Sequence, residues 1–263
     1  MNQPQMLPSL FESQQNQPLA VSVIMPVMDE TVSLRQTIQI VMDENRREDI
    51  REIICVVSPF TKPESLAICR ELEESHPGIV STRQQHRPHL GGALQDAFEW
   101  ATGTHIMLMA SDLETDPHAA KTLIETARQG WDIIATTRWT SGGGFHGYNP
   151  IKLAANWLFQ KIIGFLYRTN LTDLTYGYRI WRTETLRGHA WEELRHPFLL
   201  ECLLRPLLCG ATSTEIPVRW QARNEGESRN PFWRNFLYFR IALKLRFHRC
   251  YGVAPRPAAE VIR

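Results

Sequence analysis

Three acidic residues follow a short apolar run in the stretch MASDLETDP, residues 109–117. Asp112, Glu114 and Asp116 are spaced two positions apart. In an extended segment, side chains two apart point the same way, so the carboxylates of Asp112 and Glu114 are expected to share a face. Like charges at close range are unfavourable unless a cation, water or the fold compensates them. Two hard oxygen ligands on one face suit Mg²⁺ or Mn²⁺, with substrate phosphates completing the coordination.

Simpler explanations exist for these acids. Asp116 precedes Pro117 and a segment expected to be helical up to Gly130, so a helix N-cap is its natural role. For Asp112 and Glu114 the alternative is a solvated acidic loop. We favour metal binding, because ligands of α/β sheets bind outside the carboxyl ends of the strands.

Short apolar segments alternate with longer amphipathic ones from residue 20 onward. Strands are expected within residues 20–26, 52–57, 105–109, 131–137, 176–182 and 212–222, and helices within 30–44, 62–75, 91–103, 116–130, 151–168 and 196–210, the last broken or kinked near Pro206. This alternation predicts an α/β fold with a mostly parallel sheet flanked by helices. The acidic stretch then falls at the end of a strand.

Composition narrows the class of protein. The chain has 263 residues, 43% hydrophobic and 22% charged, which is typical of a folded protein with a substantial core. The net charge of +1 argues neither for nor against nucleic acid, and no nucleic-acid partner is expected. The five cysteines lack CxxC spacing, so we expect reduced thiols rather than a zinc site. Residues 1–19 resemble a flexible polar tail rather than a secretory leader, which favours a cytoplasmic protein.

Four segments carry a family resemblance: VSVIMPVMDE, GGALQDAFEWATGTHIMLMASDLETDP, DLTYGYRIWRTETL and EIPVRWQARNEGESR. Together they resemble the family 2 glycosyltransferases, and within them the dolichyl-phosphate mannosyltransferase-like branch. The resemblance runs from about residue 20 to 230 with the motifs in family order. It implies a single GT-A (Rossmann-like) domain over 20–230, a nucleotide-sugar donor, Mg²⁺ or Mn²⁺, and inversion at the anomeric carbon.

The resemblance also assigns roles to individual residues. It implies metal binding by Asp112 and Glu114, because the family's Asp-x-Asp-x-Gln motif falls on Ala110, Asp112 and Glu114. The residues expected to bind the nucleotide sugar are Pro26, Met28, Asp29, Glu30, Ser58, Asp112, Arg138 and Arg229. The residues expected to act in catalysis are Asp112, Asp173, Arg179 and Glu201.

This chain departs from the family pattern at several positions. Ala110 replaces the first metal-motif aspartate, and Glu114 replaces a neutral amide and restores the formal charge. Val57 and Ser58 occupy the place of an acidic pair that usually follows the second strand. The Q-x-x-R-W motif of processive members is missing, which disfavours polymerisation.

The polar residues could serve the transfer in two ways. Arginine binds phosphate through two-pronged hydrogen bonds, so Arg138, Arg179 and Arg229 are candidate phosphate ligands, the alternative being structural ion pairs. A hydroxyl acceptor needs a general base, whereas a lipid phosphate is already anionic. Asp173 is a candidate base or an anchor for its loop. Glu201 lies in an apolar helix and is either functional or paired with an arginine.

The segment 231–249 is expected to form a basic amphipathic helix, followed by a flexible tail over 250–263. An apolar stripe combines with flanking basic residues, a pattern typical of helices on anionic membranes. The stripe consists of Phe232, Phe236, Phe239, Leu243 and Phe247. The alternative is packing of this stripe on the domain or on a second subunit, which leaves a homo-oligomer open.

We therefore expect an inverting, metal-dependent hexosyltransferase that moves one sugar from a nucleotide-sugar donor to an acceptor. A polyprenyl phosphate, met at the cytoplasmic face of a membrane, is the leading acceptor class. Transfer to a hydroxyl of a glycan or small metabolite is a second reading. A third is a nucleotide-sugar-binding protein without catalysis, motivated by Ala110 and by Val57-Ser58.

Overall fold

The protein is described here from a computed structural model. The structure describes residues 18–147, 149–221 and 235–247. Several expectations fall outside these ranges. They concern the terminal tails, Arg229 with its GESR motif, and Phe232 at the start of the expected membrane helix.

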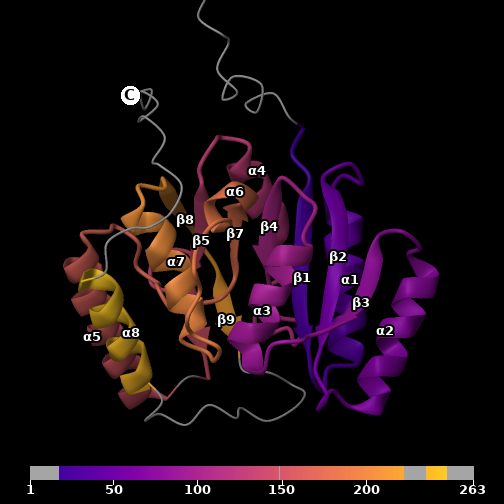
Figure 1. The fold of residues 1–263 in the computed structure, drawn as a ribbon, viewed down its shortest axis with the longest axis horizontal. Coiled ribbons are helices and arrows are strands. Elements are labelled where there is room, and N and C mark those ends of the chain that lie inside the picture. The colour runs from indigo at the N-terminus through magenta and orange to yellow at the C-terminus, as the bar shows by residue number, and fades with distance from the viewer. Residues whose placement is uncertain (1–17, 148, 222–234, 248–263) are drawn as a thin grey trace, which may run out of the picture.

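A seven-stranded sheet forms the centre of the molecule (Figure 1). Its strand order is β3-β2-β1-β4-β7-β5-β8. The strands are β1 (Val21–Val27), β2 (Ile50–Val57), β3 (Val80–Gln84), β4 (His105–Leu108), β5 (Ile133–Thr137), β7 (Arg179–Arg182) and β8 (Ser213–Pro217). Every neighbouring pair is parallel except the two pairs made by β7. The expected α/β class with a mostly parallel sheet is confirmed.

Helices cover both faces of this sheet and give three layers. The helices are α1 (Val32–Glu44), α2 (Pro63–Ser75), α3 (His89–Trp100), α4 (Ala119–Ala127), α5 (Pro150–Tyr167), α6 (Thr183–Leu186), α7 (Phe198–Leu208) and α8 (Asn235–Phe247). One apolar core joins the sheet to α1, α2 and α4. A second core joins the opposite face to α3, α5, α7 and α8. The strands contribute side chains to both cores, because strands of a buried parallel sheet are apolar on both faces.

Local sequence explains where these helices begin. Pro63 opens α2, where its fixed φ and missing N–H fit the first turn. The side chain of Asn149 accepts hydrogen bonds from the Ile151 and Lys152 amides and so caps α5. Asp116, expected as the N-cap of α4, instead accepts from the His118 amide, and α4 begins at Ala119. The N-cap of α4 is His118, so the prediction for Asp116 is wrong by two residues.

The strand β7 runs against its neighbours and thereby brings a distant loop to the strand ends. Leu108, the last residue of β4, pairs with Arg179, the first residue of β7. The segment before β7 consequently lies at the same edge of the sheet as the segments that follow β1, β2 and β4. The acidic stretch and the DLTYGYR segment meet there, although about sixty residues separate them.

A small second sheet lies beside this edge. It pairs β6 (Gly144–His146) with β9 (Arg219–Gln221) in parallel. Neither β6 nor the polar edge strand β3 was predicted, because neither has an apolar run. The helix α7 is not broken at Pro206 and ends two residues after it, at Leu208.

The cysteines only partly follow the expectation of reduced thiols. Cys55, Cys69 and Cys202 are free and buried. Cys209 is disulfide-bonded, and its partner lies outside the described residues. The prediction is therefore wrong for Cys209.

Candidate active site

The acidic stretch forms a tight turn after β4 rather than an extended segment. Leu113 has φ of 58°, a left-handed conformation that is uncommon for a branched side chain. The Glu114 amide donates to Asp112 Oδ1 over 3.0 Å, which closes the turn. The reason given from the sequence for a shared face is thus wrong. The turn, and not the alternation of side chains along an extended strand, determines the relative orientation of the Asp112 and Glu114 side chains.

The strand β9 holds this turn from outside. Thr115 forms a β-bridge with Trp220, and the Gln221 amide donates to the Glu114 carbonyl over 3.3 Å. The Trp220 indole N–H lies 3.4 Å from Glu114 Oε2. Asp112 is only 7% exposed at this place. The two carboxylates are therefore held by the fold and do not form a loosely solvated loop.

Tyr176 lies at the centre of the site and was not predicted. The guanidinium carbon of Arg138 lies over the Tyr176 ring, 4.2 Å from the ring centroid. The tyrosine is 8% exposed, and its hydroxyl has no hydrogen-bond partner in the structure. Burial raises the pKa of Tyr176 well above its usual range; the cation of Arg138 opposes this, and the carboxylates of Asp173, Asp112 and Glu114 add to it. Tyr176 is thus a neutral hydroxyl within electrostatic reach of both predicted metal ligands.

Arg138 and Asp173 form a buried ion pair beside Tyr176. Arg138 Nε and Nη2 donate to the two oxygens of Asp173 over 2.7 and 3.0 Å. The Gln160 amide adds a longer contact of 3.4 Å to Asp173. The Arg138 guanidinium also lies 4.8 Å from the Phe145 ring centroid, so aromatic rings and a carboxylate together fix its position. These contacts favour the role of Asp173 as an anchor of its loop over a role as general base.

Arg179 was expected to bind phosphate, and the structure contradicts this. The side chain is fully buried and donates to the carbonyls of Leu199 and Leu174 over 2.7 and 2.6 Å. Burial lowers the pKa of Arg179. Its partners tie the loop before β7 to α7, so Arg179 positions the site without reaching it. The sequence could not reveal this, because the register of β7 decides which way the side chain points.

Glu201 was expected in catalysis or in a pair with an arginine, and the pair is what the structure shows. Arg205 Nε donates to Glu201 over 2.6 Å, and the amides of Glu192 and Glu193 donate to the same carboxylate. Glu201 is fully buried. Its catalytic assignment is wrong, because an ion pair and two amides already use its oxygens. The network instead ties the 192–193 segment to α7.

The residues expected to cradle the donor gather after β1. Glu30 accepts from the Met28 and Asp29 amides over 2.7 and 3.1 Å. The Ser58 hydroxyl lies 3.2 Å from the Met28 sulfur. Lys62 lies on the far side, with its ammonium 3.8 Å from Asp29. The loop after β2 thus supports the segment after β1 through Ser58 and Lys62.

This cradle adjoins the acidic turn through the backbone. The Ser111 hydroxyl donates to the Pro26 carbonyl over 3.1 Å. The residues expected to hold base and ribose are therefore linked directly to those expected to hold metal and diphosphate. Among the described residues, Pro26 contacts the residue before Asp112, while Arg179 and Glu201 lie in the interior.

The donor set of the acidic turn fits a hard divalent cation. Asp112 and Glu114 offer carboxylate oxygens, the ligands preferred by Mg²⁺ and Mn²⁺. No cluster of three or more acidic, histidine or cysteine ligands occurs in the described part of the chain. Two carboxylates suit a cation whose remaining ligands are diphosphate and water, as is usual for Mg²⁺. The hydroxyl of Tyr176 is buried without a partner, and the carboxylates of Asp112 and Glu114 act on its pKa.

The mostly parallel sheet flanked by helices is the architecture of the GT-A fold. The chain belongs to the family described as Glycosyl transferase family 2, whose model matches residues 22–188. The predicted family and fold are confirmed.

Individual relatives indicate which branch of the family is most similar to this chain. The undecaprenyl-phosphate mannosyltransferase of Micrococcus luteus is 26% identical over 220 residues, which are 80% of this chain and 87% of that protein. The dolichol-phosphate mannosyltransferase of Pyrococcus furiosus is 24% identical over 238 residues, 86% of this chain. The chain spans 64% of the length of this second relative.

A solved structure shares the architecture. It is glucosyl-3-phosphoglycerate synthase from Mycobacterium tuberculosis, in complex with Mn²⁺, uridine diphosphate and glucosyl-3-phosphoglycerate. Its TM-score is 0.63 at 12% identity, over 96% of this chain and 87% of that one. At this identity the likeness concerns the fold.

Proposed function

We propose that the protein transfers one sugar from a nucleoside-diphosphate sugar to a polyprenyl phosphate. The proposal is supported by two relatives whose names specify undecaprenyl phosphate and dolichol phosphate as acceptors. The observation that carries it is that the carboxylates near the expected donor-binding residues already have partners. Asp29, Glu30 and Asp173 each have a partner already, in Lys62, in two backbone amides and in Arg138.

An acceptor that is already anionic suits such a site. A phosphate oxygen attacks the anomeric carbon, a new C–O bond forms, and the bond from that carbon to the diphosphate breaks with its electron pair. No proton has to be removed from the acceptor, so no general base is required. A hydroxyl acceptor, in contrast, would need one of the paired carboxylates to be released. We therefore favour the phosphate over the hydroxyl reading.

The protein's own residues then bind, orient and exclude water. The loop around Met28, Asp29 and Ser58 holds the base and ribose. Asp112 and Glu114 would hold a divalent cation, which would supply charge stabilisation for the leaving diphosphate worth several kcal/mol in such reactions. The Tyr176 hydroxyl donates a hydrogen bond to a phosphate oxygen, and Arg138 adds positive charge in a site that excludes water.

A matched pair of acceptors tests this function. The full chain is incubated with Mn²⁺ and a panel of radiolabelled uridine- and guanosine-diphosphate sugars, in detergent, with either undecaprenyl phosphate or undecaprenol. We expect label to enter the organic phase with the phosphate and not with the alcohol. Equal labelling of undecaprenol would favour a hydroxyl acceptor. Donor binding without any transfer would support the non-catalytic reading.

A further inference from the structure

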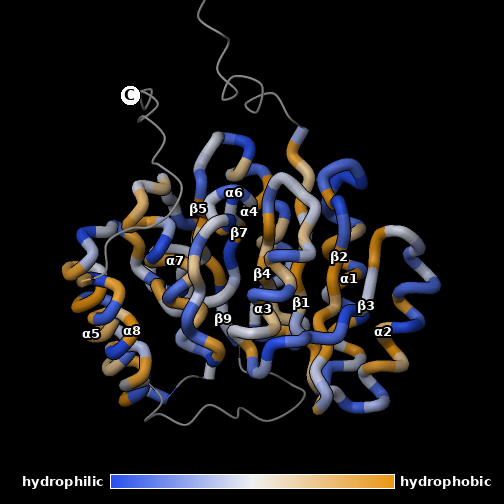
Figure 2. Tube along the Cα trace, viewed as in Figure 1, coloured by the Kyte–Doolittle hydropathy of each residue, from blue (hydrophilic) through white to orange (hydrophobic). Residues whose placement is uncertain are grey.

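Exposed apolar side chains gather on two helices. Seven of the nine large apolar side chains exposed in the described residues lie on α5 and α8, and only Val32 and Phe60 lie elsewhere. The seven are Ile151, Trp157, Leu158, Ile162, Phe165, Leu243 and Phe247, and together we name them the α5–α8 face. Figure 2 shows apolar residues along these two outer helices. Such a concentration is unusual on a surface that meets only water.

Helical spacing places most of the α5 members on one side. Ile151, Leu158, Ile162 and Phe165 follow intervals of seven, four and three residues, which bring side chains to the same face of a helix. Ile151 is 79% exposed and Phe165 is 89% exposed. Phe159 and other residues of the opposite side are buried in the core, so α5 is apolar on both sides. Only one of these sides is covered by the fold.

The helix α8 lies alongside α5 and extends this surface (Figure 1). The Tyr167 hydroxyl donates to the Ala242 carbonyl over 2.6 Å. The ring of Phe239, expected in the membrane stripe, instead packs on Phe159 with centroids 4.7 Å apart. Leu243 and Phe247 remain exposed. The stripe expected from the sequence is therefore only partly available, and α5 supplies most of the exposed apolar surface.

The charges on these helices are all of one sign. Neither Pro150–Tyr167 nor Asn235–Phe247 contains an aspartate or a glutamate. Their basic residues are Lys152, Lys161, Arg240, Lys244 and Arg246. The whole chain is nearly balanced, with 29 basic and 28 acidic residues, so this local bias is not a property of its composition.

We propose that the α5–α8 face docks on the surface of an anionic lipid bilayer. Exposed apolar side chains flanked by cations suit the boundary between acyl chains and anionic headgroups. A second copy of this chain would fit less well, because pairing the face with itself opposes Lys152, Lys161, Arg240 and Arg246 with the same four residues, while Lys244 is already paired with Glu192. No described helix is long and apolar enough to cross a membrane. The inference deepens the proposed function, on which it rests for the use of a lipid acceptor.

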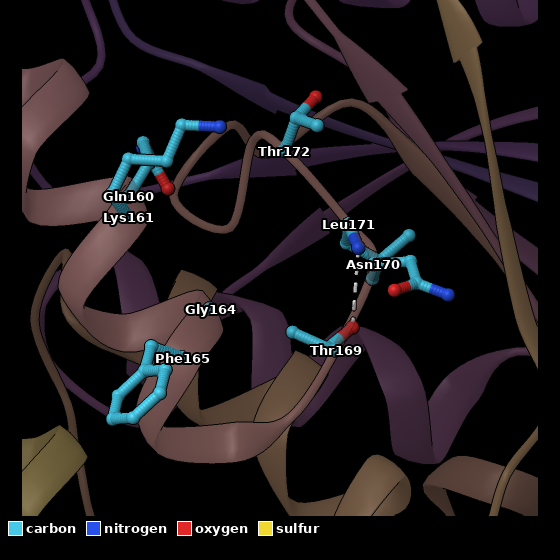
Figure 3. A pocket seen from close by; sticks show the side chains of 8 residues that line it. All are labelled: Gln160, Lys161, Gly164, Phe165, Thr169, Asn170, Leu171 and Thr172. Atoms are coloured by element: carbon cyan, nitrogen blue, oxygen red, sulfur yellow. Dashed lines mark hydrogen bonds between the residues drawn. The ribbon is translucent and has the colours of Figure 1, made fainter.

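A cavity lies beside this face, at the end of α5. It measures about 260 Å³ and lies between the C-terminal half of α5 and the loop 169–172 (Figure 3). Phe165 of the α5–α8 face lines it, and so does Gln160, whose amide contacts Asp173. The cavity therefore reaches from the docking face to a side chain that contacts the Arg138–Asp173 pair. The position of the docking face agrees with the proposed acceptor.

Vesicle co-sedimentation with the full chain tests the docking face. The vesicles contain equal parts of phosphatidylcholine and phosphatidylglycerol, and the reference vesicles contain phosphatidylcholine alone. Neither contains acceptor, and no donor is added. We expect binding to the anionic vesicles at low salt and release at high salt. Ile151→Gln with Leu158→Gln should weaken the binding by about 100-fold, since each loses the burial of one large apolar side chain.

Two further variants separate the contribution of the basic residues to vesicle binding from a general effect of exposed apolar side chains. Lys152→Gln with Arg240→Gln should weaken binding to anionic vesicles by about 25-fold and leave binding to neutral ones unchanged. Val32→Gln is the matched control, because Val32 is an exposed apolar residue on α1, and it should bind as the wild type does. All substituted side chains are at the surface, so unfolding temperatures should remain unchanged.

The outcomes discriminate the inference from the function on which it rests. Wild-type protein that stays in the supernatant with anionic vesicles overturns the inference, and so does equal binding by the Ile151/Leu158 variant. A dimer that this variant converts to a monomer, without vesicle binding, assigns the face to a second copy. Vesicle binding without sugar transfer overturns only the proposed function, whereas transfer in detergent without vesicle binding overturns only the docking face.

Discussion

At the scale of single residues, the acidic turn depends on a strained backbone. Leu113 adopts a positive φ, which costs free energy for a residue with a side chain, and such strain persists only where the surroundings enforce it. The bonds from β9 to Thr115 and Glu114 supply that enforcement. The carboxylates of Asp112 and Glu114 are therefore in place before a cation arrives, which lowers the reorganisation needed for binding.

We predict that Asp112→Asn abolishes Mn²⁺-dependent donor binding and lowers transfer by about a thousandfold, as expected from losing several kcal/mol of charge stabilisation. The asparagine oxygen can still accept from the Glu114 amide, so the unfolding temperature should stay near that of the wild type. Asp116→Asn is the matched control, because Asp116 is exposed and bonds the His118 amide. Unchanged Mn²⁺ dependence in Asp112→Asn would contradict the metal assignment.

Tyr176 offers a second test, because its hydroxyl is buried without a protein partner. We predict that Tyr176→Phe lowers kcat/KM by about 10- to 100-fold, the effect of losing one hydrogen bond to a charged group. Stability should be equal or higher, because an unsatisfied buried hydroxyl is removed.

Tyr178 provides the matched comparison for this experiment. It is also buried with an unpartnered hydroxyl and lies in the same apolar core, but the charged group that acts on its pKa is Asp116 rather than Arg138, Asp112 and Glu114. Steady-state kinetics and thermal melts of Tyr178→Phe should therefore show normal transfer. If both variants behave alike, Tyr176 does not contact the substrate.

The candidate site was partly predictable from the sequence. The acids of the turn and the residues after β1 follow strands of clear apolar pattern, so their place at the sheet edge could be inferred. The partners of Arg179 and Glu201 could not, because a buried ion and a ligand-binding ion have the same sequence signature. Tyr176 and Trp220 also gave no signal, since an aromatic residue in a short strand normally packs in a core.

At the scale of elements, the close packing around Gly103, just before β4, leaves no space for a side chain. Gly103 lies against β1, and a Cβ added to it would be 2.5 Å from the Ala20 carbonyl oxygen. Its amide donates to the Ser22 hydroxyl, and its carbonyl accepts from Thr183. Three segments that are distant in the sequence thus converge on a residue without a side chain.

We predict that Gly103→Ala lowers the free energy of unfolding by about 1–3 kcal/mol, because β1 and β4 must move apart to admit the methyl group. Gly144→Ala is the control, since a Cβ at Gly144 meets no atom within 4 Å. Urea denaturation of the two variants measures the difference. Equal stabilities would show that the β1–β4 contact is looser than described.

The sequence predicted the elements better than their pairing. Apolar runs identified most strands of the central sheet, and amphipathic patterns identified most helices. The direction of β7 was not predictable, because a buried strand of four residues has the same pattern in either orientation. β3 was missed for a different reason: it lies at an edge and is mostly polar.

At the scale of the whole molecule, a buried histidine links stability to pH. His105 lies in β4 opposite Arg182 of β7 and is nearly inaccessible to solvent. Burial, reinforced by Arg182 and opposed by Asp132, lowers the pKa of His105 to about 4. The histidine is therefore neutral in the folded state, while in the unfolded chain it binds a proton below about pH 6.5.

We predict that His105 contributes stability that is complete above about pH 6.5 and is lost as the pH falls toward 4. The loss between pH 7 and pH 5 should be about 2 kcal/mol, because the unfolded state binds the extra proton throughout this window. Urea denaturation at both pH values measures it. His105→Gln should flatten this part of the profile, and an unchanged slope would assign the pH dependence to other groups.

The antiparallel strand β7 has a consequence for how the chain acquires its structure. β5 does not pair with β4; both pair with β7, which comes forty-odd residues after β5 in the chain. During synthesis, β1 to β4 can assemble as soon as they emerge, but β5 has no neighbour on that side until β7 arrives. The arrival of β7 therefore joins the two halves of the sheet and also delivers Tyr176 and Asp173 to the strand ends. Closing such long loops slows folding, so the catalytic edge should be completed late, as one event with the joining of the two halves of the sheet.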